Sequence, residues 1–433
     1  MPSRLLFPTM RVPTRGLAAI LLAAALALGG CAGTQTASKG PGLGGARNLE
    51  KREQSFDEFL DEFRGQAVTA GIRKATVDQA FDGLVPNDRV LALMESQPEF
   101  VRPIWDYLAR TVSDRRIAQG RTRLAERRAQ LAAAEKETGV PAQVMVAIWG
   151  LETNYGGNTG SFSIIQALAT QAWKGRRAKW ARGELMNALR IVDRGDVPLA
   201  RLKGSWAGAF GQTQFMPSVY LSHAVDADGD GKRDLLGSSA DALHSTGNLL
   251  RHYQWKRGEP WGFEVKLPRG FPWAEAEYKV SKSLAEWRDL GVRRIGGGAL
   301  ARGALSSEHQ ASIIIPAGHK GPAFLVMGNF RSLLRYNRAT SYALSVAHLS
   351  DRIAGGRAFV AAWPTGETPL KVSEMKELQQ RLTAIGCDAG KPDGVIGRKT
   401  RAAVRCYQRQ TGQPADGYPT QKLLARLRGG GTS

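Results

Sequence analysis

The sequence predicts a mainly α-helical protein with a small β element and a small helical unit at its C-terminus. Apolar residues recur at helical spacing over 113–136, 141–220 and 331–353. Short apolar runs typical of strands lie between the last two stretches, at 263–267, 312–315 and 324–327. Of the 433 residues 42% are hydrophobic, which excludes a disordered chain, and the length suits about three domains.

Local signals along the chain justify these elements. Ser55 is expected to cap a first helix, because acidic residues follow it and apolar side chains then recur on one face. Residues 113–136 read as one long basic helix with apolar residues spaced by seven. Three such positions are too few for a coiled coil, so they predict core contacts. The runs at 312–315 and 324–327 predict a hairpin.

The charge balance restricts the partners. Lys and Arg number 60 against 39 Asp and Glu, a formal net charge of +21, so the protein should seek a polyanion: nucleic acid, anionic lipid or an acidic polymer such as a cell wall. Charge alone does not choose among these. The H-E-x-x-H, G-x-S-x-G and P-loop motifs are absent, and the six His show no metal-ligand spacing, which argues against those chemistries.

The N-terminus has the pattern of an export signal. Residues 17–28 are almost wholly Ala, Leu and Ile, too few to span a bilayer, and they follow a short basic segment. They run into Leu28-Gly-Gly-Cys31, which resembles a bacterial lipobox, so we expect residues 1–30 to be a signal peptide and Cys31 to be lipidated. Ala32 favours sorting to the periplasmic face of the outer membrane, where nucleic acid is no partner. The alternative is a plain secreted protein.

A flexible tether and a linker separate the predicted domains. Residues 34–45 are mostly Gly, Ser, Thr and Pro, so residues 31–54 are expected to form a flexible tether to the membrane. A folded unit is expected over 55–362. Residues 363–372 read as a second linker, followed by a small unit over 373–428 that is too short to bury a large core alone.

Glu152 is the outstanding candidate for acid–base chemistry. Residues 141–152 begin with Pro and are apolar on every side until Glu152, which indicates a buried helix ending at Gly156-Gly157. Burial and the negative end of the helix dipole should both raise the pKa of this carboxyl, as a general acid needs. The alternative from position alone is a Glu that pairs with an Arg at the helix end.

Glu152 is the only acidic residue between Thr138 and Gly183. Most glycoside hydrolases use two carboxylates that flank the scissile bond. Without a second one, the acetamido group and a hydroxyl of the sugar itself would have to stabilise and attack the reacting carbon. Asp193 and Asp196 remain open as a second carboxylate.

Three blocks resemble one known family. Residues 147–156, 204–220 and 329–343 are similar, in the same order, to the signatures of membrane-bound lytic murein transglycosylases of the B type, and the similarity covers roughly 55–360. The resemblance implies a lysozyme-like helical catalytic core. It also implies cleavage of the MurNAc–GlcNAc β-1,4 bond of peptidoglycan, without water, to a 1,6-anhydro-muramyl product. Glu152 would be the single acid/base, and the chemistry would need no cofactor.

The resemblance also assigns substrate contacts. Carried over position by position, it places the following residues along the glycan strand: Tyr155, Ser205, Gln214, Tyr336 and Asn337. Hydroxyls and amides suit sugar hydroxyls and acetamides, and an aromatic ring can stack on a pyranose. For each residue the alternative is a structural polar group.

A loop with regularly spaced acids predicts a structural Ca²⁺ site. Acids occupy positions one, three, five and nine of an EF-hand-like loop, and Gly231 occupies position six, but Gly237 stands where the bidentate Glu belongs. Asp241 could close a longer loop, as in the resembling family. The alternative is a solvated acidic turn. The predicted ligands are Asp226, Asp228, Asp230, Asp234 and Asp241.

The C-terminal unit resembles the three-helix peptidoglycan-binding domain attached to many wall enzymes. The run from Asp393-Gly394 to Thr400 reads as a turn that feeds a helix N-terminus, which either binds the wall or only makes the turn. Cys387 and Cys406 could pair in an oxidising compartment.

The sequence therefore favours a lytic transglycosylase and leaves two alternatives. One is a hydrolytic muramidase, which would need a second carboxylate. The other is a catalytically weak peptidoglycan-binding lipoprotein, against which the intact Glu152, Ser205 and Gln214 argue.

Overall fold

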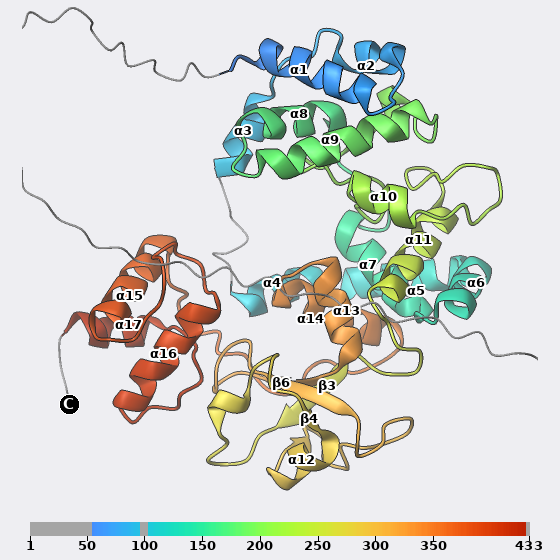
Figure 1. Ribbon diagram of the computed structural model, residues 1–433. Coiled ribbons are helices and arrows are strands. Elements are labelled where there is room, and N and C mark those ends of the chain that lie inside the picture. Colours follow the sequence, from blue (N-terminus) through green and yellow to red (C-terminus); the bar gives the residue numbers. More distant parts are fainter. Residues whose placement is uncertain (1–53, 96–102, 430–433) are drawn as a thin grey trace, which may run out of the picture. The chain divides into compact units, whose positions relative to one another are not determined.

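The computed structural model describes residues 54–95 and 103–429 (Figure 1). The described part is mainly helical, with 17 α-helices and seven short strands. The predictions for the signal peptide, for Cys31 and for most of the tether lie outside the described residues. None of the described helices combines the length and the apolar character that crossing a membrane requires.

One group of helices, which includes the first three of the described chain, surrounds an aromatic core. Figure 1 shows α1 and α2 lying over α8 and α9. The Ser55 hydroxyl accepts from the Glu58 backbone N–H at 3.2 Å, and the Glu58 carboxylate accepts from the Ser55 N–H at 2.8 Å, so the predicted cap is a full capping box. Phe59, Phe63 and Phe81 are buried between the helices. The members are α1 (Phe56–Thr69), α2 (Lys74–Phe81), α3 (Asp88–Glu95), α8 (Ile164–Lys174), α9 (Ala178–Asp193) and α10 (Pro217–His223).

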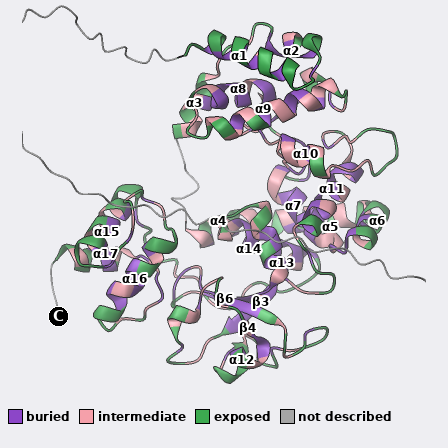
Figure 2. Cartoon of the chain, viewed as in Figure 1, coloured by how far each residue is buried: buried purple, intermediate pink, exposed green. Residues whose placement is uncertain are grey.

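A second group packs around α7. Every residue of α7 from Val144 to Gly150 is buried, and α5, α11 and α14 pack against this helix. By contrast, Figure 2 colours much of α6 as exposed. The members are α4 (Ile104–Thr111), α5 (Asp114–Glu126), α6 (Arg128–Thr138), α7 (Ala142–Thr153), α11 (Ser239–His252), α13 (Gly328–Tyr336) and α14 (Thr340–Ile353).

The prediction of one long helix over 113–136 is wrong in one respect, because the structure has two helices there, α5 and α6. The break lies at Arg127, whose φ of −105° and ψ of 18° leave the helical region. Ile117 and Leu131 are buried on either side of the break, as the prediction of core contacts required. The α6 helix packs mainly against α11 and also contacts α7, whereas α5 packs against α7 and α14.

The β element is a five-stranded antiparallel sheet with the order β4-β6-β7-β3-β5. The predicted hairpin is confirmed, with Ile313 opposite Leu325. Its core contains Val265 and Trp287, the latter from α12 (Leu284–Asp289). The strands are β3 (Gly262–Lys266), β4 (Lys282–Ser283), β5 (Arg293–Arg294), β6 (Gln310–Ile314) and β7 (Ala323–Val326). A separate two-stranded ladder pairs β1 (Phe162–Ser163) with β2 (Lys203–Gly204).

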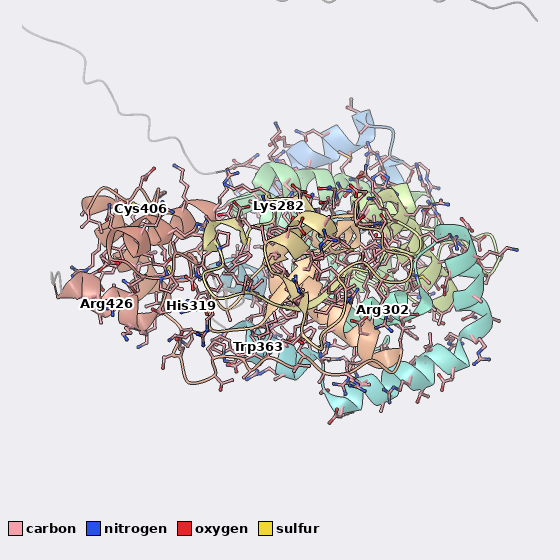
Figure 3. All side chains as sticks on the ribbon, turned by 90° about the horizontal axis from the view of Figure 1, so that it is seen from below. Lys282, Arg302, His319, Trp363, Cys406 and Arg426 are labelled. Atoms are coloured by element: carbon pink, nitrogen blue, oxygen red, sulfur yellow. A yellow bond between two sulfur atoms is a disulfide. The ribbon has the colours of Figure 1, made fainter. Side chains whose placement is uncertain are left out.

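The C-terminal unit has a core of its own. It consists of α15 (Val372–Ala384), α16 (Arg398–Gln410) and α17 (Gln421–Arg428). Leu378, Leu382 and Val404 are fully buried among these helices. Cys387 and Cys406 form a disulfide across Cα atoms 5.8 Å apart, and Figure 3 labels Cys406 within this unit.

Candidate active site

Glu152 lies in the last turn of α7, where the chain reverses sharply. Asn154 and Tyr155 follow it with φ values of 52° and 60°, two consecutive non-glycine residues in the left-handed region. Such backbone costs on the order of 1–3 kcal/mol per residue and is concentrated at functional sites. The apolar helix thus delivers a single carboxyl to the point where the chain turns away.

The protonation of Glu152 is set by its surroundings. Burial raises the pKa of its carboxyl to about 7, and a hydrogen bond from the Tyr342 hydroxyl, 2.6 Å from Oε1, opposes that rise. The side chain remains partly exposed. At neutral pH both the acid and the carboxylate form are therefore populated, so Glu152 can donate a proton and then accept one.

Contacts around Glu152 join the three sequence blocks of the predicted site. Tyr342 lies parallel to Tyr336, with ring centroids 6.2 Å apart. The Tyr336 hydroxyl donates to the backbone carbonyl of Thr213 at 2.5 Å, and the Thr153 hydroxyl donates to the backbone carbonyl of Gln212 at 2.6 Å. The end of α7, the loop around 213 and the 336–342 segment are thereby held together, although nearly 200 residues separate the first from the last.

The polar residues predicted to bind glycan lie on these same segments. Gln214 has a φ of 53°, and its side-chain amide donates to the carbonyls of Thr159 and Gly211, each at 3.0 Å. The Ser205 hydroxyl, half-buried, accepts from the Ala209 N–H at 3.1 Å. Asn337 is exposed, and its side-chain oxygen accepts from the Ala339 N–H at 3.1 Å.

The substrate contact expected for Tyr155 does not agree with its placement. Its ring is only 6% exposed, packs edge-on against Trp149 and covers Gly150. Its hydroxyl donates to the Arg116 carbonyl at 2.6 Å. A ring enclosed in this way cannot stack on a sugar, so we correct its role: Tyr155 fixes the turn after α7 against α5.

Tyr342 is the site residue that sequence reasoning missed. It lies within the third block, six residues after Tyr336, but nothing in the local sequence indicates that its hydroxyl reaches Glu152 from α14. The only available signal was its presence in the block itself.

Both candidates for a second carboxylate are bound elsewhere. Asp193 accepts from Arg73 at 2.8 Å and from the Thr76 hydroxyl at 2.6 Å. Asp196 pairs with Arg233 at 2.6 Å. Over the described residues, burial and Tyr342 account for the pKa shift of Glu152 without a contribution from another carboxylate.

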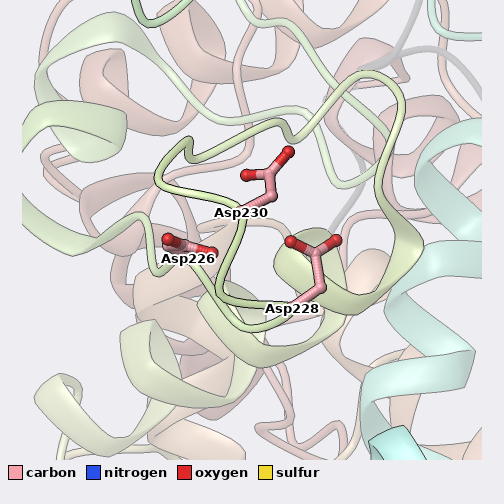
Figure 4. A group of neighbouring side chains, drawn as sticks. All are labelled: Asp226, Asp228 and Asp230. Atoms are coloured by element: carbon pink, nitrogen blue, oxygen red, sulfur yellow. The ribbon is translucent and has the colours of Figure 1, made fainter.

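The predicted cation loop lies between α10 and α11, and three of its five acids converge. Carboxylate oxygens of Asp226, Asp228 and Asp230 lie within 4.8 Å of one another (Figure 4). Asp234 instead pairs with Arg201 at 3.2 Å. Asp241 is buried and accepts from two backbone N–H groups of the loop, which closes the loop around the three acids.

Two known protein families match different parts of this chain. Residues 55–351 match the model of the transglycosylase SLT domain, and residues 371–427 match that of a putative peptidoglycan binding domain. This chain belongs to the transglycosylase SLT domain family. The match to the first model covers more than half of the chain, and it includes Glu152 and all three blocks around it.

Relatives of this SLT-domain protein include enzymes of the bacterial wall. The membrane-bound lytic murein transglycosylase B of Escherichia coli K12 is 35% identical over 227 residues, which span 51% of this chain and 58% of that protein. SltB3 of Pseudomonas aeruginosa, solved with NAG-anhNAM-pentapeptide, is 49% identical with a TM-score of 0.84, over 87% of this chain and all of that one. The lytic transglycosylase Slt35 of E. coli, solved with calcium, is 27% identical with a TM-score of 0.60, over 71% and 97% of the two chains.

Proposed function

We propose that this protein is a lytic transglycosylase of peptidoglycan, with Glu152 as its single acid/base. It would cleave the MurNAc–GlcNAc β-1,4 bond and leave 1,6-anhydro-MurNAc ends, in turnover and remodelling of the wall. The observation that carries this proposal is a carboxyl whose pKa burial raises to about 7, with no other carboxylate of the described residues contributing to that shift. The SltB3 complex with an anhydro-muramyl peptide supports the same chemistry.

In the proposed reaction one side chain, Glu152, makes both proton transfers. Protonated Glu152 gives its proton to the glycosidic oxygen as the bond from that oxygen to the muramyl C1 breaks. The resulting carboxylate then takes the proton of the muramyl C6 hydroxyl, whose oxygen bonds to C1. No water is consumed, and Glu152 is protonated again. The Tyr342 hydroxyl stabilises the transient carboxylate, since it donates to Oε1.

The glycan strand would contact polar side chains on the segments that meet at Glu152. We assign Ser205, Gln214 and Asn337 to hydrogen bonds with sugar hydroxyls and acetamides, and Tyr336 to packing against a sugar ring. Their common placement on the segments that meet at Glu152 supports this assignment. The C-terminal unit would hold the enzyme on the wall.

Glu152→Gln tests the proposal. The amide keeps the shape of the side chain but neither gives nor takes the proton, so turnover of purified sacculi should fall by more than the 10²–10⁴ typical of general acid–base catalysis. Binding to sacculi and the melting temperature should stay close to wild type. Glu126→Gln, an exposed Glu at the end of α5, is the matched control and should retain full activity. Retained turnover in Glu152→Gln would contradict the assignment.

We also propose that the acidic loop binds one structural Ca²⁺. Its donors are carboxylate oxygens, which suit a hard cation, and Gly231 adopts the positive φ of 83° that the tight turn needs. Asp226, Asp228 and Asp230 would be the side-chain ligands, and Asp241 would hold the loop in shape. The calcium complex of Slt35 supports the choice of ion.

We place the protein on the periplasmic face of the outer membrane, anchored through a lipid on Cys31. The lipobox-like segment supports this location, as does the description of the E. coli relative as membrane-bound. Globomycin should cause an unprocessed precursor to accumulate. Unchanged processing under globomycin would reject the anchor.

A further inference from the structure

The end of α8, the turn after it and the first residues of α9 concentrate cations and tryptophans. Residues 173–182, here called the basic-aromatic loop, contain five Lys or Arg, two Trp and no acid. Arg176, Arg177 and Lys179 are exposed. The Arg177 guanidinium lies 4.1 Å from the centre of the Trp180 ring, and the Lys174 ammonium lies 4.5 Å from that of Trp173.

Two acids of α1, Asp61 and Glu62, already have partners. Glu62 pairs with Arg182 at 2.9 Å, and hydrogen bonds from Arg182 and Gln54 lower the pKa of Glu62 to about 2. Asp61 pairs with Arg64. Arg182 is engaged in this way, and Lys174 also has a partner. Within the described residues no ion pair joins Arg176, Arg177 or Lys179 to an acid, so the outer part of the loop keeps its positive charge.

The basic-aromatic loop lies where the tether joins the folded body. The Trp173 indole N–H donates to the backbone carbonyl of Gln54 at 2.8 Å, and its ring packs edge-on against Phe56. Residues 31–53 precede this point. A random-coil chain of that length would span on average about 26 Å. A membrane that held Cys31 would therefore be within reach of this loop.

We propose that the basic-aromatic loop docks on an anionic phospholipid surface and so orients the catalytic domain against the membrane. Tryptophan rings favour the headgroup region, and each Lys or Arg near an anionic bilayer adds attraction. The tether raises the effective concentration of lipid, so a weak contact is enough. The orienting role rests on the proposed anchor at Cys31, but the lipid affinity of the loop does not.

The test measures vesicle binding by the chain from residue 32 onward, which lacks the lipid but keeps every described residue. Vesicles with about 30% phosphatidylglycerol are compared with pure phosphatidylcholine at about 0.1 M salt. Wild type should bind the anionic vesicles only. Arg176→Ser/Arg177→Ser/Lys179→Ser should weaken binding on the order of tenfold to a hundredfold.

The matched control removes three exposed cations from the β element, as Lys266→Ser/Arg269→Ser/Arg302→Ser (Arg302 is labelled in Figure 3). It changes the net charge equally and should bind like wild type. Lys179→Glu provides a second variant that should not unfold the protein, because an acid suits the first turn of α9. It should also weaken vesicle binding.

Three results would overturn the proposal: no binding by wild type, equal losses in both triple variants, or a loss of binding to sacculi with vesicle binding unchanged. The last result would assign the loop to the wall polymer instead. Cleavage of soluble glycan is followed in parallel and should be equal in all variants. A failure of the proposed catalytic function would thus be seen separately.

Discussion

Burial favours the acid form of Glu152, whereas the Tyr342 hydroxyl, 2.6 Å from its carboxyl oxygen, favours the carboxylate. A group that must first donate and then accept a proton works best when neither form is strongly preferred. Glu152 has that balance near neutral pH. The same hydroxyl would stabilise the carboxylate after the first proton transfer, and it disfavours the acid form that the first transfer needs.

Tyr342→Phe should move the alkaline limb of the activity profile to higher pH. Cleavage begins from protonated Glu152, so activity falls as pH rises through its pKa of about 7. Loss of the hydroxyl removes the interaction that lowers this pKa, so the acid form persists to higher pH. Initial rates between pH 5 and 9 check this.

Tyr220→Phe is the control for this prediction, because it removes a buried hydroxyl that donates to the Arg233 carbonyl. Its profile should match wild type. An alkaline limb that stays in place, or moves down, in Tyr342→Phe would contradict our account of the proton balance.

Single residues were predictable from sequence when their neighbours along the chain set their environment. Glu152 is such a case, since the apolar helix and the following glycines predict a buried carboxyl at a helix end. Tyr155 is the opposite case, because its burial depends on Arg116 and Gly120, which lie on another helix. The hydrogen bond from Tyr342 likewise depends on how α14 packs against α7.

Helices and strands were predictable where nearby residues in the sequence mark their position. Ser55 with Glu58 fixes the start of α1, and the apolar runs around 313 and 325 fix the hairpin. No Gly or Pro near Arg127 indicates the break in the sequence. Both helices contact α7, but α6 packs mainly against α11 and α5 also packs against α14, a difference that only the tertiary structure reveals.

The loop between α10 and α11 should couple Ca²⁺ to stability. Three carboxylates within 4.8 Å repel one another, and a bound cation relieves this repulsion only in the folded state. Millimolar Ca²⁺ should therefore raise the free energy of unfolding on the order of 2 kcal/mol relative to EDTA. This corresponds to an increase of several degrees in the melting temperature. Thermal melts followed by circular dichroism check this.

Asp230→Asn should reduce this gain, because it removes one charged ligand while Asn can still accept from the Lys232 N–H. Asp289→Asn, an exposed acid far along the chain in α12, should leave it unchanged. Superimposable melting curves of wild type in EDTA and in Ca²⁺ would count against the site.

The whole molecule combines units whose stabilities differ in origin. The helical core is extensive, whereas the C-terminal unit has three short helices and a small core. Closing a loop between residues 19 apart contributes about 3 kcal/mol by restricting the unfolded chain. The disulfide therefore supports the unit with the smallest buried core.

Cys387→Ser/Cys406→Ser should destabilise the C-terminal unit by about 3 kcal/mol. Thermal melts should show an earlier transition for this unit, and sacculus binding should weaken at elevated temperature. Glu152 lies outside the unit, so cleavage of soluble glycan should be retained. Thiol labelling of the native oxidised chain from residue 32 provides the direct check. Labelling of both cysteines before reduction would reject the bond.

The central claim is that Glu152 alone performs both proton transfers and that no water attacks the muramyl carbon. Mass spectrometry of sacculi digested by wild type in H₂¹⁸O tests it most directly. We expect products with 1,6-anhydro-MurNAc ends and no ¹⁸O. Reducing ends that carry ¹⁸O would show hydrolysis and a second carboxylate, and would contradict the account.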